Sequence, residues 1–160
     1  MKRISVYLGA IILIFVDQLT KLAVIDNLKD KSITIIKDIL NFTYCENRGV
    51  AFSIGNGHVP TFIVVNLIII CVLTVYYEKN KEEFQSLLNK IFFTMVIAGG
   101  ASNLVDRVLR GFVVDFIDIN GLFDFAIFNI ADVFIVVGII GLVISIFIGE
   151  LKKINEKNKQ

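Results

Sequence analysis

Residues 130–148 read IADVFIVVGIIGLVISIFI, an apolar run long enough to cross a lipid bilayer as a single helix. Asp132, the third residue of this run, is its only ionisable residue. An ionised carboxylate at bilayer depth is costly unless it is paired or protonated, and such groups usually mark a proton, ion or catalytic site. The run therefore predicts a membrane helix and makes Asp132 a candidate functional residue.

Three further segments, residues 4–25, 59–77 and 91–109, are also apolar and long enough to span a bilayer. The first resembles a signal peptide, but no small-residue cleavage site follows it, which favours a retained helix. Hydrophobic residues make up 56% of the chain, and its mean hydropathy is +0.76. Too little polar surface remains to cover a soluble globule. We therefore predict an α-helical integral membrane protein with four transmembrane helices, forming one domain over residues 1–160.

Composition excludes several classes of function. A formal net charge of +1 gives no indication of nucleic-acid binding, and a single histidine, His58, excludes a multi-histidine metal site. The two cysteines, Cys45 and Cys71, are too few for a disulfide framework and are interpreted as small apolar residues. We expect neither a metal nor another cofactor.

The distribution of basic residues predicts the orientation in the membrane. An even number of spans places both termini on one side, and Lys and Arg near span ends favour the cytoplasm. With both termini inside, the cytoplasmic segments hold nine of the sixteen basic residues, namely Lys2, Arg3, Lys79, Lys81, Lys90, Lys152, Lys153, Lys157 and Lys159. In this orientation, nearly all ionisable residues within the spans lie toward the outer face.

Charged and amide side chains in the first and third spans are spaced for mutual contact. Asp17 and Lys21 are four residues apart and share one face of a helix. Asn103, Asp106 and Arg107 end the third span at spacings of three and four. The pairs Asp17 with Lys21, and Asp106 with Arg107, are predicted intramembrane ion pairs that support a site on the outer side.

Two segments are expected outside the membrane. Residues 31–57 are rich in β-branched and aromatic residues and predict a small β-sheet, followed by a turn at Asn47 and Gly49. The Asn47 amide is also able to bind a substrate backbone or a reacting oxygen. Residues 110–128 alternate in pattern and predict an extended strand over the mouth of the bundle, which as an exposed strand would be suited to pair with a peptide.

The sequence leaves the partner of Asp132 open. Asp115, Asp118 and Asp124 all lie in the second outer segment, and Asp115 has the most apolar surroundings. Two carboxyls brought together can share one proton and activate a water molecule. A structural explanation competes, because Asn129 is placed to cap the last helix and an acidic residue three positions later favours a helix N-terminus.

Five motifs occur in order along the chain: Asp17-Gln18-x-Thr20-Lys21, Asn47-x-Gly49-x-Ala51-Phe52-Ser53, Gly99-Gly100-Ala101-x-Asn103-x-x-Asp106-Arg107, Val114-Asp115-Phe116 and Phe128-Asn129-x-Ala131-Asp132. Together they resemble the bacterial lipoprotein signal peptidase, the type II signal peptidase, which is a family of membrane aspartyl proteases. The resemblance covers nearly the whole chain. One departure is Ser102, which stands where many members have glycine.

The resemblance implies an endopeptidase that removes the signal peptide from diacylglyceryl-modified prolipoproteins, cutting just before the lipidated cysteine. It also implies a small β-cradle and a short outer element above the helices. We expect a monomer in contact with membrane lipid. The active site would lie near the outer face of the bacterial plasma membrane. Asp115 and Asp132 would be the catalytic dyad, with eight residues that position substrate or support the site: Asn47, Asn103, Arg107, Asp17, Lys21, Asp106, Gly49 and Asn129.

Rival functions are weaker on the sequence. A small proton- or ion-coupled transporter would use the buried carboxylates as a path, but the inner halves of the spans are almost free of ionisable residues. A non-catalytic membrane subunit would tolerate asparagine at both aspartates. Serine and thiol nucleophiles lack a convincing base nearby.

Overall fold

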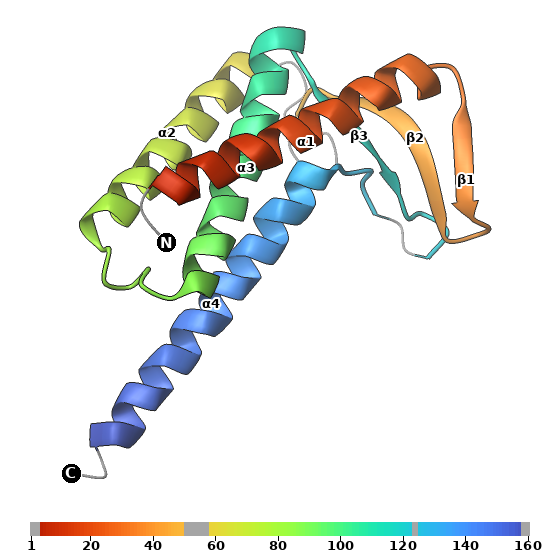
Figure 1. Ribbon diagram of the computed structural model, residues 1–160. Helices are drawn as coiled ribbons and strands as arrows, with labels where there is room; N and C mark the ends of the chain where they lie inside the picture. The colour runs from red at the N-terminus through yellow and green to blue at the C-terminus, as the bar shows by residue number, and fades with distance from the viewer. Residues whose placement is uncertain (1–3, 50–57, 123–124, 158–160) are drawn as a thin grey trace.

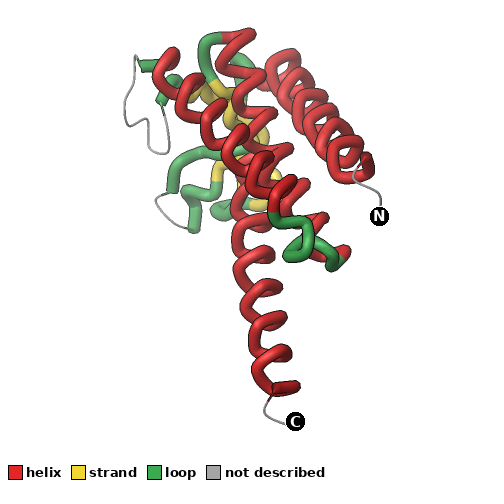
Figure 2. The backbone as a smooth tube through the Cα atoms, turned by 90° about the vertical axis from the view of Figure 1, so that its left-hand side faces the viewer, coloured by secondary structure: helices red, strands yellow, loops and turns green. Residues whose placement is uncertain are grey.

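The computed structural model describes residues 4–49, 58–122 and 125–157 of the chain (Figure 1). Its helices are α1 (Ile4–Leu28), α2 (Val59–Lys79), α3 (Leu87–Arg110) and α4 (Ile130–Lys157). All four include a segment long and apolar enough to cross a membrane, which confirms the predicted fold class. The helices are longer than the apolar runs alone, and α4 continues beyond the ends of the other helices (Figure 2).

Helix α3 is the centre of the bundle and packs against each of the other three helices. Small residues permit its close approach to α4. A Cβ added at Gly99 would lie 2.3 Å from the Ala131 carbonyl oxygen, and one at Gly141 would lie 2.5 Å from the Phe92 ring. Any side chain at Gly99 therefore forces the two helices apart, as at other close helix crossings in membranes.

Three strands form one antiparallel sheet in the order β1 (Ser32–Ile36), β2 (Leu40–Asn47) and β3 (Val113–Asp118). The predicted extended strand in residues 110–128 is confirmed as β3, but the strand is not exposed as expected. β3 joins the sheet, and its Val114 and Phe116 are buried against Val24 and Leu28 at the end of α1. Burying these apolar side chains outweighs any advantage of an exposed edge.

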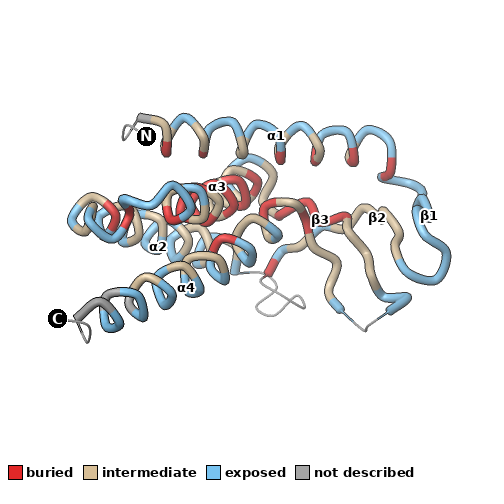
Figure 3. Tube along the Cα trace, turned by 60° about the horizontal axis from the view of Figure 1, so that its bottom comes forward, coloured by how far each residue is buried: buried red, intermediate tan, exposed pale blue. Residues whose placement is uncertain are grey.

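Burial follows the inward faces of the helices. Buried positions recur along one side of α1 and gather on α3, while the remaining helix surface is exposed or half-buried (Figure 3). The exposed positions are strongly apolar, as at Ile11 and Phe15, which are 61% and 62% exposed. A multi-pass membrane protein covers such surfaces with lipid. The polar residues are thereby confined to the interior and to the ends of the bundle.

Candidate active site

Asp115 and Asp132 meet where β3 and the start of α4 come together. The connection between them is Asn129, whose side-chain Nδ2 donates a hydrogen bond to Asp115 Oδ1 at 2.6 Å. The backbone N–H of the same residue donates to Asp132 Oδ2 at 3.1 Å. One asparagine therefore holds both carboxyls. Of the other aspartates left open by the sequence, Asp118 lies farther along β3, and Asp124 lies outside the described residues.

Asn129 and Asp132 also form the first turn of α4. Asn129 Oδ1 accepts a hydrogen bond from the Asp132 backbone N–H at 3.0 Å, and Asp132 Oδ2 accepts one from the Asn129 backbone N–H. This reciprocal pair is a capping box. The structural explanation of Asp132 is therefore correct, and it holds alongside the site. The second Asp132 oxygen, Oδ1, accepts a bond from Asn103 Nδ2 on α3 at 2.8 Å. Both oxygens thus face N–H donors at a helix N-terminus, where negative charge is favoured.

Asp115 occupies a different environment, with a side chain almost fully withdrawn from solvent. Burial first, and then the negative charge of Asp132, raise the pKa of Asp115 to about 7. Hydrogen bonds from Asn47 Nδ2, at 2.9 Å, and from Asn129 act in the opposite direction. A carboxyl with this pKa is close to the midpoint of its titration at neutral pH.

Cys45 is paired with Asp115 in the register of the sheet. Burial, followed by the neighbouring Asp115 carboxylate, raises the pKa of the Cys45 thiol. This direction is opposite to the one that activates a thiol nucleophile.

The Asn47–Gly49 turn is present and also contributes to the site. Asn47 Oδ1 accepts the Gly49 N–H at 3.0 Å, which leaves the Asn47 amide nitrogen to bond Asp115. The Gly49 carbonyl oxygen accepts a hydrogen bond from Arg107 Nη2 at 3.0 Å. The later motif residues Ala51-Phe52-Ser53 lie outside the described residues.

A fully buried cluster of charges lies behind the carboxyl pair. The Lys21 ammonium lies 2.8 Å from Asp17 Oδ2 and 2.9 Å from Asp106 Oδ2, and it donates to Asn103 Oδ1 at 3.0 Å. The Asp17–Lys21 pair follows the predicted spacing. The predicted pair of Asp106 with Arg107 was wrong, because adjacent residues on a helix point in different directions.

The charge cluster connects four elements, in two pairs. Asp17 Oδ1 accepts the backbone N–H of Ala131, which fixes α1 to the first turn of α4. Asp106 Oδ2 accepts the backbone N–H of Val114, which fixes α3 to β3. The strand and the helix that hold the two candidate catalytic aspartates are thus anchored by the same cluster.

Sequence reasoning missed three contributors to this cluster. Ser102 donates its hydroxyl to Asp17 Oδ2 at 2.6 Å. Gln18 donates to Asp106 Oδ1 at 2.9 Å, and Arg110 forms an ion pair with Asp106. The spacing of four between Asp106 and Arg110 was the available signal for that pair.

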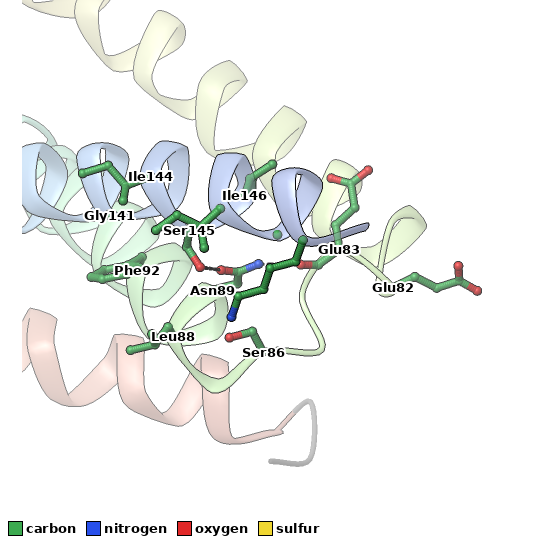
Figure 4. A pocket seen from close by; sticks show the side chains of 13 residues that line it. Glu82, Glu83, Ser86, Leu88, Asn89, Phe92, Gly141, Ile144, Ser145 and Ile146 are labelled. Carbon is green, nitrogen blue, oxygen red and sulfur yellow. Dashed lines mark hydrogen bonds between the residues drawn. The ribbon is translucent and has the colours of Figure 1, made fainter. Parts of the chain in front are cut away.

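A cavity of about 570 Å³ opens beside the carboxyl pair. It is bounded by residues of α2, α3, β3 and α4, including Asn66, Gly100, Asp115, Asp132 and Val136. A second cavity, of about 580 Å³, lies toward the opposite ends of α3 and α4 (Figure 4). Its buried polar residue Asn89 accepts a bond from Ser145 and donates to the Glu83 carbonyl oxygen.

The first cavity therefore combines space for a substrate with a pair of carboxyls, one of them titrating near neutral pH. Such a pair is able to activate water by general acid and base catalysis. Within residues 4–49, 58–122 and 125–157, no group of three or more His, Cys, Asp or Glu side chains is arranged to hold a metal ion.

Comparison with known proteins identifies the family. A sequence profile described as signal peptidase (SPase) II matches residues 9–148. The chain belongs to the signal peptidase II family. A lipoprotein signal peptidase of Clostridioides difficile strain 630 is 40% identical over 143 residues, covering 89% of this chain and 94% of the relative. Another, from Halothermothrix orenii, is 38% identical over 134 residues, covering 83% and 88%.

Solved structures agree with this signal peptidase II assignment. A bacterial membrane enzyme determined at 2.3 Å resolution superimposes with a TM-score of 0.78 at 34% identity, covering 89% of this chain and 87% of that one. A second bacterial membrane enzyme structure gives a TM-score of 0.77 at 35% identity. The resemblance drawn from the five motifs is confirmed, and the chain is a multi-pass membrane protease.

Proposed function

We propose that this chain removes the signal peptide from diacylglyceryl-modified prolipoproteins, cutting just before the lipidated cysteine, with Asp115 and Asp132 as its catalytic dyad. The observation that carries the proposal is the pair of carboxyls joined through Asn129 at the edge of a cavity. Family membership supports the reaction class, and the names of the relatives support a lipoprotein substrate.

The two aspartates take different roles. We assign the role of general base to Asp132, because it lies in the first turn of α4, where the helix dipole stabilises a carboxylate. Asp115, whose pKa is raised to about 7, carries the shared proton and polarises the scissile carbonyl. Neighbouring carboxyls titrate as a coupled pair, and repulsion between them favours the singly protonated state.

Proton transfers follow from this assignment. Asp132 takes a proton from water as the water oxygen bonds to the scissile carbonyl carbon, and Asp115 gives its proton to the carbonyl oxygen. In the second step, Asp132 protonates the departing amide nitrogen and Asp115 recovers a proton from the intermediate. The C–N bond breaks, and the dyad returns to its starting protonation.

Neighbouring residues position the reacting groups. Asn103 and Asn47 each donate to one aspartate and thereby hold the two carboxyls in place. Arg107 holds the Gly49 carbonyl at the edge of the cavity. The buried cluster of Asp17, Lys21 and Asp106 braces these elements from behind.

We further propose that both termini are cytoplasmic and that the dyad lies near the outer face of the bacterial plasma membrane. A diacylglyceryl group contributes about 0.8 kcal/mol per buried methylene and keeps the substrate cysteine at the bilayer surface. Peptide and dyad then meet at one depth. A single chain supplies all the residues of the site, which is consistent with a monomer.

The test is cleavage of a diacylglyceryl-modified prolipoprotein by the purified protein in detergent. Asp115→Asn and Asp132→Asn should lower the rate by about 10²–10⁴-fold, because each removes a group that transfers a proton. Asp118→Asn, in the same strand, is the matched control and should cut at the native rate. Thermal unfolding verifies that each variant is folded. Native-like cutting by either dyad variant would reject the proposed dyad.

A further inference from the structure

Asn66 is an amide within the second membrane span, and nothing in the family motifs assigns it a function. It lies on α2 and borders the same cavity as Asp115 and Asp132. Its Nδ2 donates to the Gly100 carbonyl oxygen at 3.0 Å. Among the described residues, no group donates a hydrogen bond to its oxygen. An amide oxygen left without a donor in an apolar setting costs free energy.

The surroundings of Asn66 leave its oxygen accessible from the cavity. Gly100 presents no side chain there, and a Cβ at that position would lie 3.5 Å from Asn66 Oδ1. Beyond Asp132, the α4 wall of the cavity is apolar, with Ile135 and Val136. An occupant of the cavity that brings a donor would satisfy the amide oxygen of Asn66.

The depth of Asn66 relative to the dyad indicates which group of a bound substrate would donate to its oxygen. Its partner Gly100 precedes Asn103 by three helical residues, or about 4.5 Å along the axis, and Asn103 contacts Asp132. In the proposed orientation, the signal peptide approaches the dyad from this inner side. An extended peptide advances about 3.3 Å per residue, which brings the N–H one or two residues before the scissile bond level with Asn66.

We propose that Asn66 Oδ1 accepts a backbone N–H of the signal peptide one or two residues before the scissile bond. This hydrogen bond recognises the peptide backbone and does not depend on a side chain, which suits an enzyme that acts on many signal peptides. This inference rests on the proposed function. The competing explanation is that Asn66 only fastens α2 to α3 through the Gly100 carbonyl.

A double-substitution cycle between enzyme and substrate separates these explanations. Lipidated peptide substrates are prepared with a single N-methyl group at each of the three amides before the scissile bond. In the native enzyme, methylation of one amide level with Asn66 should raise KM about tenfold, the effect of one lost hydrogen bond of about 1.4 kcal/mol. Asn66→Leu should raise KM similarly for the unmethylated peptide and leave kcat nearly unchanged.

The decisive result is the combination. In Asn66→Leu, methylation of the amide that lies level with residue 66 should raise KM little further, because the hydrogen bond is already absent. Losses that multiply, or an Asn66→Leu enzyme with native KM, would overturn the inference. If Asn66→Leu does not fold, the methylated peptides are compared in the native enzyme alone. The inference is then overturned if methylation one or two residues before the scissile bond raises KM no more than methylation at the third amide.

The matched control is Thr74→Val on the same helix, since the Thr74 hydroxyl bonds the Ile70 carbonyl of its own helix. This variant should show native KM and the native methylation profile. Failure of the native enzyme to cut any of these peptides would count against the proposed function itself, which is a separate result.

Discussion

At the residue scale, the Lys21 ammonium determines which way the Asn103 amide points. Lys21 contacts two carboxylates and also donates to Asn103 Oδ1. Asn129 Nδ2 donates to the same Asn103 oxygen. With its oxygen held by two donors, Asn103 turns its nitrogen toward Asp132. The Lys21 cation on α1 thereby orients the Asn103 amide that donates a hydrogen bond to Asp132.

Lys21→Met tests this arrangement. The substitution leaves Asp17 and Asp106 buried without their shared cation, and breaking a buried ion pair in this way typically costs 3–5 kcal/mol. We expect a clearly lower unfolding temperature in detergent and loss of peptidase activity. Lys81→Met is the matched control, because the Lys81–Glu78 ion pair is exposed to solvent. Equal unfolding temperatures for the two variants would contradict the prediction.

The pH dependence of cleavage tests the proton assigned to Asp115. The pKa of this carboxyl is raised to about 7, and the proposed mechanism needs its protonated form. We therefore expect kcat/KM to fall as the pH rises above about 7. The Asn47 bond favours the ionised form and lowers this pKa. Asn47→Ala should accordingly move the falling limb to higher pH.

A pH–rate profile in detergent measures both effects. Asn41→Ala is the control, since Asn41 lies on the same strand and its amide oxygen accepts a bond from Thr34, away from the carboxyl pair. The assignment of the shared proton to Asp115 would be contradicted by a profile that stays flat to pH 9. It would also be contradicted if the falling limb of Asn47→Ala moved to lower pH.

Individual contacts of the site were harder to predict from sequence than its members. Asp17 and Lys21 share a helix face, and their ion pair follows from spacing alone. Bonds between elements have no such local signal. The bond from Ser102 to Asp17 joins residues far apart in sequence, and it exists only because α1 and α3 pack together. Asn129 was predicted to cap a helix, whereas its second role needed the position of β3.

At the element scale, the spans were predictable because each helix satisfies its own backbone and its apolar length matches the bilayer. The sheet was predicted only in part. Strand-forming composition indicates an extended segment but does not specify its partner, and β3 pairs with a strand from the other outer segment. That pairing decides which of the three candidate aspartates reaches Asp132.

Gly99→Ala tests the contact between α3 and α4. A Cβ at residue 99 would lie within 2.3 Å of the Ala131 carbonyl and 2.7 Å of the Ile135 side chain. The helices must separate, which moves Asn103 away from Asp132. We expect a large loss of activity, measured as kcat, together with a lower unfolding temperature. Gly149→Ala meets nothing within 4 Å and should be neutral. Native activity in Gly99→Ala would show that the dyad tolerates a wider helix contact.

At the scale of the whole molecule, the buried charged residues Asp17, Lys21, Asp106 and Asp115 lie toward one end of a bundle whose outer surface is apolar. The sheet and the carboxyl pair lie at the ends of α1 and α3 and at the start of α4 (Figure 1). In the proposed orientation this end faces outward. The loop between α2 and α3, which includes the exposed Glu82, then faces the cytoplasm.

Cysteine labelling tests that orientation. Cys45→Ser and Cys71→Ser remove the native thiols, after which Lys37→Cys or Glu82→Cys introduces one exposed thiol at either end. A membrane-impermeant maleimide added to intact cells should label position 37 and not position 82. Position 82 should become reactive once the membrane is opened. The reverse pattern would invert the proposed topology.

The capping box at Asn129 and Asp132 has a consequence for biogenesis. One proposed catalytic carboxyl lies on a strand that precedes the last helix, and the other lies in the first turn of that helix. The residue that joins them is the one that starts the helix. A nascent chain whose final segment is still inside the ribosome has only one of the two carboxyls in place. If the two carboxyls form the proposed dyad, hydrolysis begins only after synthesis has delivered the fourth helix.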